Sequence, residues 1–202
     1  MLISGYSDPI NHALAFAAKH HDQQVRKGRS APYLTQPANV AIILTRYGQD
    51  EATTVAGILH DVVEDYVRDG YSREMLEPRI VDKFGEAVLE TVLSITPRKF
   101  DDDGVELDTE EKHVDYLTRL AAANNDARWV CAADKLHNAA TILADLRRTV
   151  DPDSVWKRVS AGREMVRHHR QVVDRLQAVG FSAPIMQELS TVVTELEEWS
   201  RT

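Results

Sequence analysis

Residues 52–65 read Ala-Thr-Thr-Val-Ala-Gly-Ile-Leu-His-Asp-Val-Val-Glu-Asp, and this stretch predicts both a helix and a candidate site. On a helix with His60 at zero, Asp61 falls at about 100°, Glu64 at about 40° and Asp65 at about 140°. The opposite arc is apolar and suits a protein core; it holds Ala52, Val55, Ala56, Ile58, Leu59, Val62 and Val63. The polar arc gathers an imidazole and three carboxylates, which is typical of a divalent metal with a hydrolytic water.

A simpler interpretation of the same arc is a solvated acidic face, which many surface helices carry. Two features speak for the metal site. Glu64 and Asp65 lie toward the expected C-terminal end of the helix, where the helix dipole disfavours negative charge. His60 and Asp61 are adjacent and could supply two ligands from neighbouring positions.

A second helix is expected over residues 129–145. With Asp134 at zero, Asn138 falls at about 40°, Thr141 at about 340° and Asp145 at about 20°, so these side chains form one narrow polar stripe. The opposite half is apolar and comprises Trp129, Ala132, Ala133, Leu136, Ala139, Ala140, Leu143 and Ala144. A mostly apolar helix is buried, and its polar groups need partners. Two readings stay open: Asp134 in a core network, paired to an arginine or capping a neighbouring helix, or Asp134 as a metal ligand followed by substrate-binding side chains.

Composition limits the class of protein. The chain has 202 residues, of which 43% are hydrophobic, and this suits one compact domain over residues 1–202. The net charge of -8 argues against a nucleic-acid partner, although a metal and a few basic residues can still bind an anionic substrate. A single cysteine, Cys131, fits a reducing compartment, and no stretch resembles a signal peptide or a membrane span. We therefore expect a cytoplasmic protein without a membrane partner.

Start and stop signals along the chain predict an all-α fold, since no run of alternating apolar residues indicates a strand. The expected helices cover residues 8–21, 37–47, 52–65, 73–84, 86–94, 109–123, 129–145, 153–179 and 183–200. The acidic stretch 97–108 is expected to be a loop, either a plain surface connection or a mobile segment near a site. His168 and His169 are expected to face solvent. The amphipathic C-terminal helices could pair between subunits, so a homo-oligomer is possible.

The pairs His60-Asp61 and Glu64-Asp65, together with Asp134, resemble the HD-domain metal-dependent phosphohydrolases. More narrowly, the chain resembles the hydrolase domain of the bifunctional alarmone (ppGpp) synthetase/hydrolases and their small single-domain relatives. Four segments carry the resemblance: AFAAKHHDQQVRKGRSAPYLTQPANVAIIL, AGILHDVVED, FGEAVLETVLSIT and AADKLHNAATIL. It is strongest over residues 13–145, and residues 153–202 have no equally specific features. The resemblance implies a single compact HD-domain helical fold with two additional C-terminal helices.

The resemblance also implies an activity, a cofactor and roles for particular residues. Members bind one divalent ion, commonly manganese, and remove the 3′-pyrophosphate of guanosine tetraphosphate or pentaphosphate to give GDP or GTP. The implied metal ligands are His60, Asp61 and Asp134, and the residues implied to orient or deprotonate the attacking water are Glu64 and Asp65. The residues implied to bind substrate are Arg26 and Lys27 at the phosphates, and Tyr33, Asn138 and Thr141 at the nucleoside.

One position departs from the family pattern. The family has Tyr-x-x-His-Pro, and its histidine is the remaining metal ligand, whereas this chain reads Tyr33-Leu34-Thr35-Gln36-Pro37. Gln36 offers only a neutral amide oxygen, which binds a transition metal more weakly than imidazole does. The alternatives to a working alarmone hydrolase are therefore a weakened or silent nucleotide-binding relative, or a phosphohydrolase that acts on another nucleotide.

Overall fold

A computed structural model describes residues 5–22, 24–25, 31–63, 73–101, 103–159 and 161–201 of the chain. Over these ranges the backbone forms ten helices and no strand, and its only strand-like pairs are two isolated β-bridges. The predicted all-α class is confirmed. The helices are α1 (Asp8–His20), α2 (Thr35–Arg46), α3 (Glu51–Leu59), α4 (Arg73–Phe84), α5 (Glu86–Ile95), α6 (Thr109–Ala122), α7 (Asn125–Leu146), α8 (Pro152–Trp156), α9 (Glu164–Ala178) and α10 (Ile185–Arg201).

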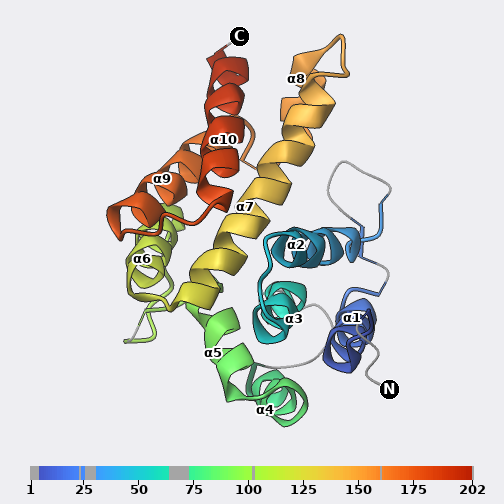
Figure 1. Ribbon diagram of the computed structural model, residues 1–202. Helices are drawn as coiled ribbons and strands as arrows, with labels where there is room; N and C mark the ends of the chain where they lie inside the picture. Colours follow the sequence, from blue (N-terminus) through green and yellow to red (C-terminus); the bar gives the residue numbers. More distant parts are fainter. Residues whose placement is uncertain are drawn as a thin grey trace.

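Helix α7 is the central element of the fold. It runs between the N-terminal helices α1, α2 and α3 on one side and helices α6, α9 and α10 on the other, with α4 and α5 at one end (Figure 1). The helix is buried along much of its length because small and apolar side chains cover most of its circumference, including Val130, Ala133 and Leu136. Asp134, in the middle of this helix, is buried.

Helix α3 is shorter than the sequence predicts. It begins after Asp50, whose side chain accepts a hydrogen bond from the backbone N–H of Thr53, and it ends at Leu59 rather than at residue 65. Thr53 and Thr54 are buried, because α3 packs against α1, α2, α5 and α7. The Thr54 hydroxyl is satisfied by donating to the Asp50 carbonyl. The candidate ligands His60 and Asp61 therefore directly follow the end of a buried helix.

The single helix predicted over residues 153–179 is wrong. The structure has two helices here, α8 and α9, separated by a turn in which Ala161 has φ 63° and Gly162 has φ 54°. Left-handed backbone cannot continue an α-helix, and Gly162 is the residue in the sequence that signals this break. Helix α10 agrees with the expected helix over residues 183–200 to within two residues at each end.

The apolar faces of the C-terminal helices are used within the chain. Leu189, Val193 and Leu196 of α10 are buried, and α10 packs against α7 and α9. This buried face is therefore not available for pairing between subunits. The formation of a homo-oligomer stays a prediction. His169 of α9 is also buried, so the expectation that it faces solvent is wrong; its Nδ1 bonds the Met165 carbonyl oxygen, and burial lowers its pKa to about 4.

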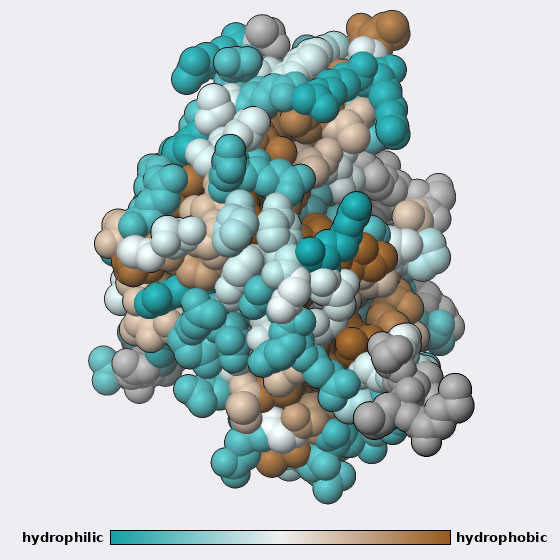
Figure 2. Space-filling view, viewed as in Figure 1, coloured by the Kyte–Doolittle hydropathy of each residue, from teal (hydrophilic) through white to brown (hydrophobic). Residues whose placement is uncertain are grey.

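Hydrophilic residues cover most of the face seen in Figure 2, and hydrophobic residues show in patches between them. Among the helices of the described part of the chain, none is both long enough and apolar enough to cross a membrane.

An arginine–carboxylate network fastens α6 to the end of α5. Asp115 accepts hydrogen bonds from Arg98 and Arg119, and Arg119 also donates to the carbonyl oxygens of Leu93 and Thr96. The pKa of Asp115 lies below its ordinary value, and the largest cause is hydrogen bonding from Arg98. These contacts cover carbonyl groups that the C-terminal end of α5 leaves without helical partners.

We expect Asp115→Asn to lower the free energy of unfolding at neutral pH by about 1–3 kcal/mol, because two guanidinium groups lose their charged partner. Since the folded pKa of Asp115 lies below the unfolded value, its contribution is complete above the unfolded pKa. The contribution disappears as the pH falls through the folded pKa. Urea unfolding from pH 7 to pH 3 measures this, and the difference in free energy of unfolding between the two proteins should shrink toward the acid end. A difference that is the same at pH 7 and pH 3 would contradict the assignment.

Candidate functional site

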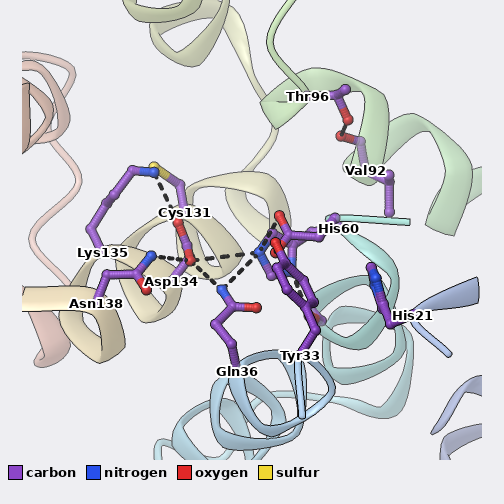
Figure 3. A network of polar contacts seen from close by, with 12 residues as sticks. His21, Tyr33, Gln36, His60, Val92, Thr96, Cys131, Asp134, Lys135 and Asn138 are labelled. Carbon is purple, nitrogen blue, oxygen red and sulfur yellow. Dashed lines mark hydrogen bonds and ion pairs between the residues drawn. The ribbon is translucent and has the colours of Figure 1, made fainter. Parts of the chain in front are cut away.

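Three polar side chains from distant parts of the chain meet beside α7. His60 and Asp61 directly follow α3, and Asp134 lies in the middle of α7. The His60 Nε2 atom is 3.1 Å from Asp61 Oδ1 and 3.6 Å from Asp134 Oδ1 (Figure 3). His60 and Asp134 are buried, and the side chain of Asp61 is only 14% exposed. The structure thus brings together the three side chains that the sequence singled out as ligands.

The orientation of His60 is set by its own helix. Its Nδ1 lies 2.7 Å from the carbonyl oxygen of Gly57, so Nδ1 carries a proton and donates it there. Nε2 is therefore the atom that faces the two carboxylates. Burial alone would lower the pKa of His60, but Asp61 and Asp134 outweigh burial and raise it well above its ordinary value. The carboxylates thus create a place that favours positive charge.

Asp134 is held by side chains from two helices. Its Oδ1 accepts hydrogen bonds from Gln36 Nε2 at 2.6 Å and from Asn138 Nδ2 at 2.7 Å, and its Oδ2 accepts one from Lys135 Nζ at 2.8 Å. Burial would raise the pKa of Asp134, but Lys135 and His60 hold it well below its ordinary value. Asp134 is therefore an anion inside the protein. The interpretation in which Asp134 belongs to a core network expected an arginine as its partner. In the structure the basic partner of Asp134 is Lys135.

Tyr33 supports Asp61 from the segment that precedes α2. The Tyr33 hydroxyl donates to Asp61 Oδ2 at 2.9 Å, and its ring packs against the ring of His21 with centroids 4.6 Å apart. The family resemblance implied that Tyr33 lies at the nucleoside. In the structure Tyr33 orients the Asp61 carboxylate, and its place beside the nucleoside stays a prediction.

Thr141 lies two turns beyond Asp134 on α7 and makes a different contribution. Its hydroxyl donates to the His137 carbonyl oxygen at 2.6 Å, and the residue lines a cavity of about 650 Å³ between α2, α7 and the start of α10. Two arginines, Arg46 and Arg148, also line this cavity. The remaining lining residues are Ile43, Tyr47, Leu136, His137, Ala140, Ala144, Asp145 and Glu188. A cavity of this size is within the range of small-molecule sites.

Four of the residues singled out from the sequence lie outside the described part of the chain. These are the candidates for water activation, Glu64 and Asp65, and the candidates for phosphate binding, Arg26 and Lys27.

Lys135 was not singled out from the sequence, but it contacts the candidate site. Its Nζ bonds Asp134 and lies 5.6 Å from the centre of the Tyr116 ring, and the adjacent anion outweighs burial and raises the pKa of Lys135 well above its ordinary value. A lysine next to an acid on an otherwise apolar stretch of α7 was the signal that could have found it, because such a charge needs a partner when buried.

The side chains at this site can be compared with the ligands that a divalent cation needs. They offer one imidazole nitrogen and two carboxylates, and the buried Gln36 Oε1 adds an amide oxygen that has no hydrogen-bond partner among the described residues. Within the described ranges, no three His, Cys, Asp or Glu side chains are already arranged around a common cation position, and Gln36 Nε2 lies against both Asp134 and His60. The donor types fit a divalent cation, provided that the Gln36 amide turns.

Comparison with known proteins identifies the family of the chain. The sequence profile of the HD domain matches residues 13–167. The chain is 30% identical over 196 residues to "GTP pyrophosphokinase" of Myxococcus xanthus, which covers 96% of this chain and 22% of the relative. It is also 30% identical over 139 residues to a guanosine-3′,5′-bis(diphosphate) 3′-pyrophosphohydrolase of Aquifex aeolicus (strain VF5), which covers 68% of this chain and 18% of that protein. The chain thus spans about a fifth of the length of these curated relatives.

A solved structure resembles nearly the whole chain. It is described as a metazoan ortholog of SpoT that hydrolyzes ppGpp and plays a role in starvation responses; the TM-score is 0.71 at 25% identity, covering 94% of this chain and 96% of the other. A second, from Listeria monocytogenes EGD-e, has a TM-score of 0.65 at 27% identity and covers 81% of this chain and 99% of the other. The fold, the convergence of His60, Asp61 and Asp134, and the profile match over residues 13–167 together show that the chain belongs to the HD domain family.

Proposed function

We propose that this protein is a divalent-metal-dependent phosphohydrolase that removes the 3′-pyrophosphate of guanosine tetraphosphate or pentaphosphate, with Mn²⁺ as the metal. The observation that carries the proposal is the meeting of His60, Asp61 and Asp134, three side chains suited to a divalent cation, inside an HD domain. HD domain hydrolases depend on a divalent metal, and the relatives named for ppGpp hydrolysis act on a small nucleotide. The similarity to the ppGpp-hydrolyzing structure over 94% of this chain supports the choice of substrate.

In this proposal His60, Asp61 and Asp134 bind the cation, which supplies Lewis acidity toward a phosphoryl oxygen and a water molecule. The Gly57 carbonyl oxygen holds a proton of His60 on Nδ1, so that Nε2 faces the two carboxylates and would be the ligand atom. Tyr33 orients Asp61, and Asn138 and Lys135 orient Asp134. These contacts fix the site before substrate arrives.

The remaining roles in the proposal fall to residues known from the sequence alone. Glu64, with Asp65, orients the attacking water and takes its proton, and the Arg26 guanidinium and the Lys27 ammonium bind the phosphates. We assign the nucleoside to the side of Asn138 and Thr141, where Thr141 lines the cavity of about 650 Å³.

The test is direct incubation of the purified protein with guanosine tetraphosphate and Mn²⁺. We expect equimolar GDP and pyrophosphate to appear, and we expect no turnover after treatment with a chelator. Guanosine pentaphosphate should give GTP. The same assay with the corresponding adenosine compounds tests the base. Failure of every substrate at every Mn²⁺ concentration, in protein that stays folded, would overturn the proposal.

One observation favours a second candidate, a nucleotide-binding relative without turnover. The Gln36 amide donates to Asp134, as it would in a network that needs no cation. This candidate predicts stoichiometric binding of guanosine tetraphosphate without products in the same assay, and no dependence of that binding on metal. A third outcome, turnover of a different nucleotide, would keep the reaction class and change the substrate.

We further propose that residues 1–202 act as one domain in the cytoplasm. The support for one domain is the packing of α10 against α7, which joins the C-terminal helices to the candidate site. The support for a reducing compartment is Cys131, a buried free thiol.

A further inference from the structure

The side chain of Gln36 is buried beside the candidate ligands and is only half satisfied. The residue is 4% exposed, and its Nε2 donates to Asp134 Oδ1 at 2.6 Å and lies 3.3 Å from His60 Nε2. Its Oε1 is buried and has no hydrogen-bond partner within the described ranges. An amide oxygen buried without a partner costs free energy, so an orientation that uses this oxygen has something to gain.

The two ends of the amide have nearly the same shape and opposite hydrogen-bonding character. A half-turn about the last side-chain bond exchanges Nε2, which donates, with Oε1, which accepts. In the present orientation the NH₂ group donates to the Asp134 carboxylate, which can only accept, and lies 3.3 Å from His60 Nε2. In the exchanged orientation Oε1 faces the Asp134 carboxylate, and this approach of two acceptors is favourable only when a cation lies between them.

We infer that Gln36 is the residue that determines which cation this protein selects, by turning its amide so that Oε1 becomes the fourth protein ligand. The inference rests on the proposed function, since it concerns the same site. The completed set would hold one nitrogen and three oxygen donors. Oxygen donors suit Mn²⁺ and Mg²⁺, whereas a second imidazole in place of the amide would favour Zn²⁺. The NH₂ group would also compete with the cation for Asp134, which makes binding weaker and reversible.

Gln36→His tests the inference through affinities rather than activity. Binding of Mn²⁺ followed by electron paramagnetic resonance, and of Zn²⁺ by competition with a chelator, gives the affinity ratio of Zn²⁺ to Mn²⁺. We expect this ratio to rise by about 10-fold or more in Gln36→His. The matched control is Asn39→His, which adds the same imidazole at an exposed position of α2 and should leave the ratio unchanged.

A second measurement keeps Gln36 in place and so does not depend on a folded variant. In ¹⁵N-labelled protein, addition of Mg²⁺ should shift the side-chain NH₂ resonance of Gln36, because its hydrogen bond to Asp134 is lost when the amide turns. The NH₂ resonance of Gln187, on the exposed face of α10, should not move. A Gln36 resonance that stays in place while Mg²⁺ binds would overturn the inference.

The outcomes separate this inference from the proposed function. Mn²⁺ bound at His60 and Asp134, with an unchanged affinity ratio in Gln36→His, would reject the role of Gln36 and leave the hydrolase intact. A changed ratio and a moving resonance, without hydrolysis of any nucleotide, would keep the role of Gln36 and reject the hydrolase. Folded wild-type protein that binds none of the three cations would reject both.

Discussion

Asp134→Asn is expected to lower turnover of guanosine tetraphosphate by about 10³-fold or more, since loss of a ligand should exceed the 10–100-fold cost of losing a residue behind one. Asp134 is a buried anion that faces His60 at 3.6 Å and takes hydrogen bonds from Gln36, Asn138 and Lys135. An asparagine keeps the shape but removes the charge, so a divalent cation loses a charged ligand. Steady-state kinetics and Mn²⁺ binding measured on the same preparation should fall together.

The control for Asp134→Asn is Asp174→Asn, the same chemical change at an exposed position of α9. It should leave turnover and Mn²⁺ affinity at wild-type values. Circular dichroism of Asp134→Asn separates lost binding from lost folding. Full activity in a folded Asp134→Asn protein would remove Asp134 from the list of ligands.

Gly57→Val should be the most destabilising of the substitutions considered, with a loss of about 3 kcal/mol or more in the free energy of unfolding. A Cβ at Gly57 would lie 2.5 Å from Leu44 Cδ1 and 3.3 Å from Val40 Cγ1, both in fully buried side chains of α2. The extra methyl groups of valine would therefore force α2 and α3 apart. Since the Gly57 carbonyl oxygen orients His60, the loss of packing should also weaken cation binding in any protein that folds.

Urea denaturation compares Gly57→Val with Ala52→Val, which adds a valine to the exposed side of the same helix. Ala52→Val should cost no more than about 0.6 kcal/mol, because only helix propensity changes. If the two variants unfold at the same urea concentration, the close approach of α2 and α3 at Gly57 is not important for stability.

Most helices could be predicted because their ends carry local signals. Ser7, Asp50 and Asp108 cap their helices through side-chain oxygens, and Asp108 forms a capping box with Glu111. Where tertiary contacts decide the outcome, the pattern was not enough. Nothing local shows that α3 would stop at Leu59 instead of continuing through Val62 and Val63, both of which are buried in either case.

The same difference between local signals and tertiary contacts applies to the candidate site. The polar stripe on α7 predicted that Asp134 and Asn138 lie together, and their hydrogen bond agrees, because residues four apart share a helix face. The meeting of Asp134 with His60 joins segments 74 positions apart, and periodicity carries no information about it; the family resemblance supplied it. The contact of Gln36 with both depends on how α2 crosses α7, and that is a property of the packed core.

The reactivity of Cys131 can report local opening of the protein. Cys131 is 1% exposed, it bonds the Tyr116 hydroxyl at 3.1 Å, and burial raises its pKa. A thiol in this state is inert toward alkylating reagents as long as it stays buried. The rate of its modification therefore measures how often the packed structure exposes Cys131, one turn from Asp134, in protein that carries no substitution and no added dye.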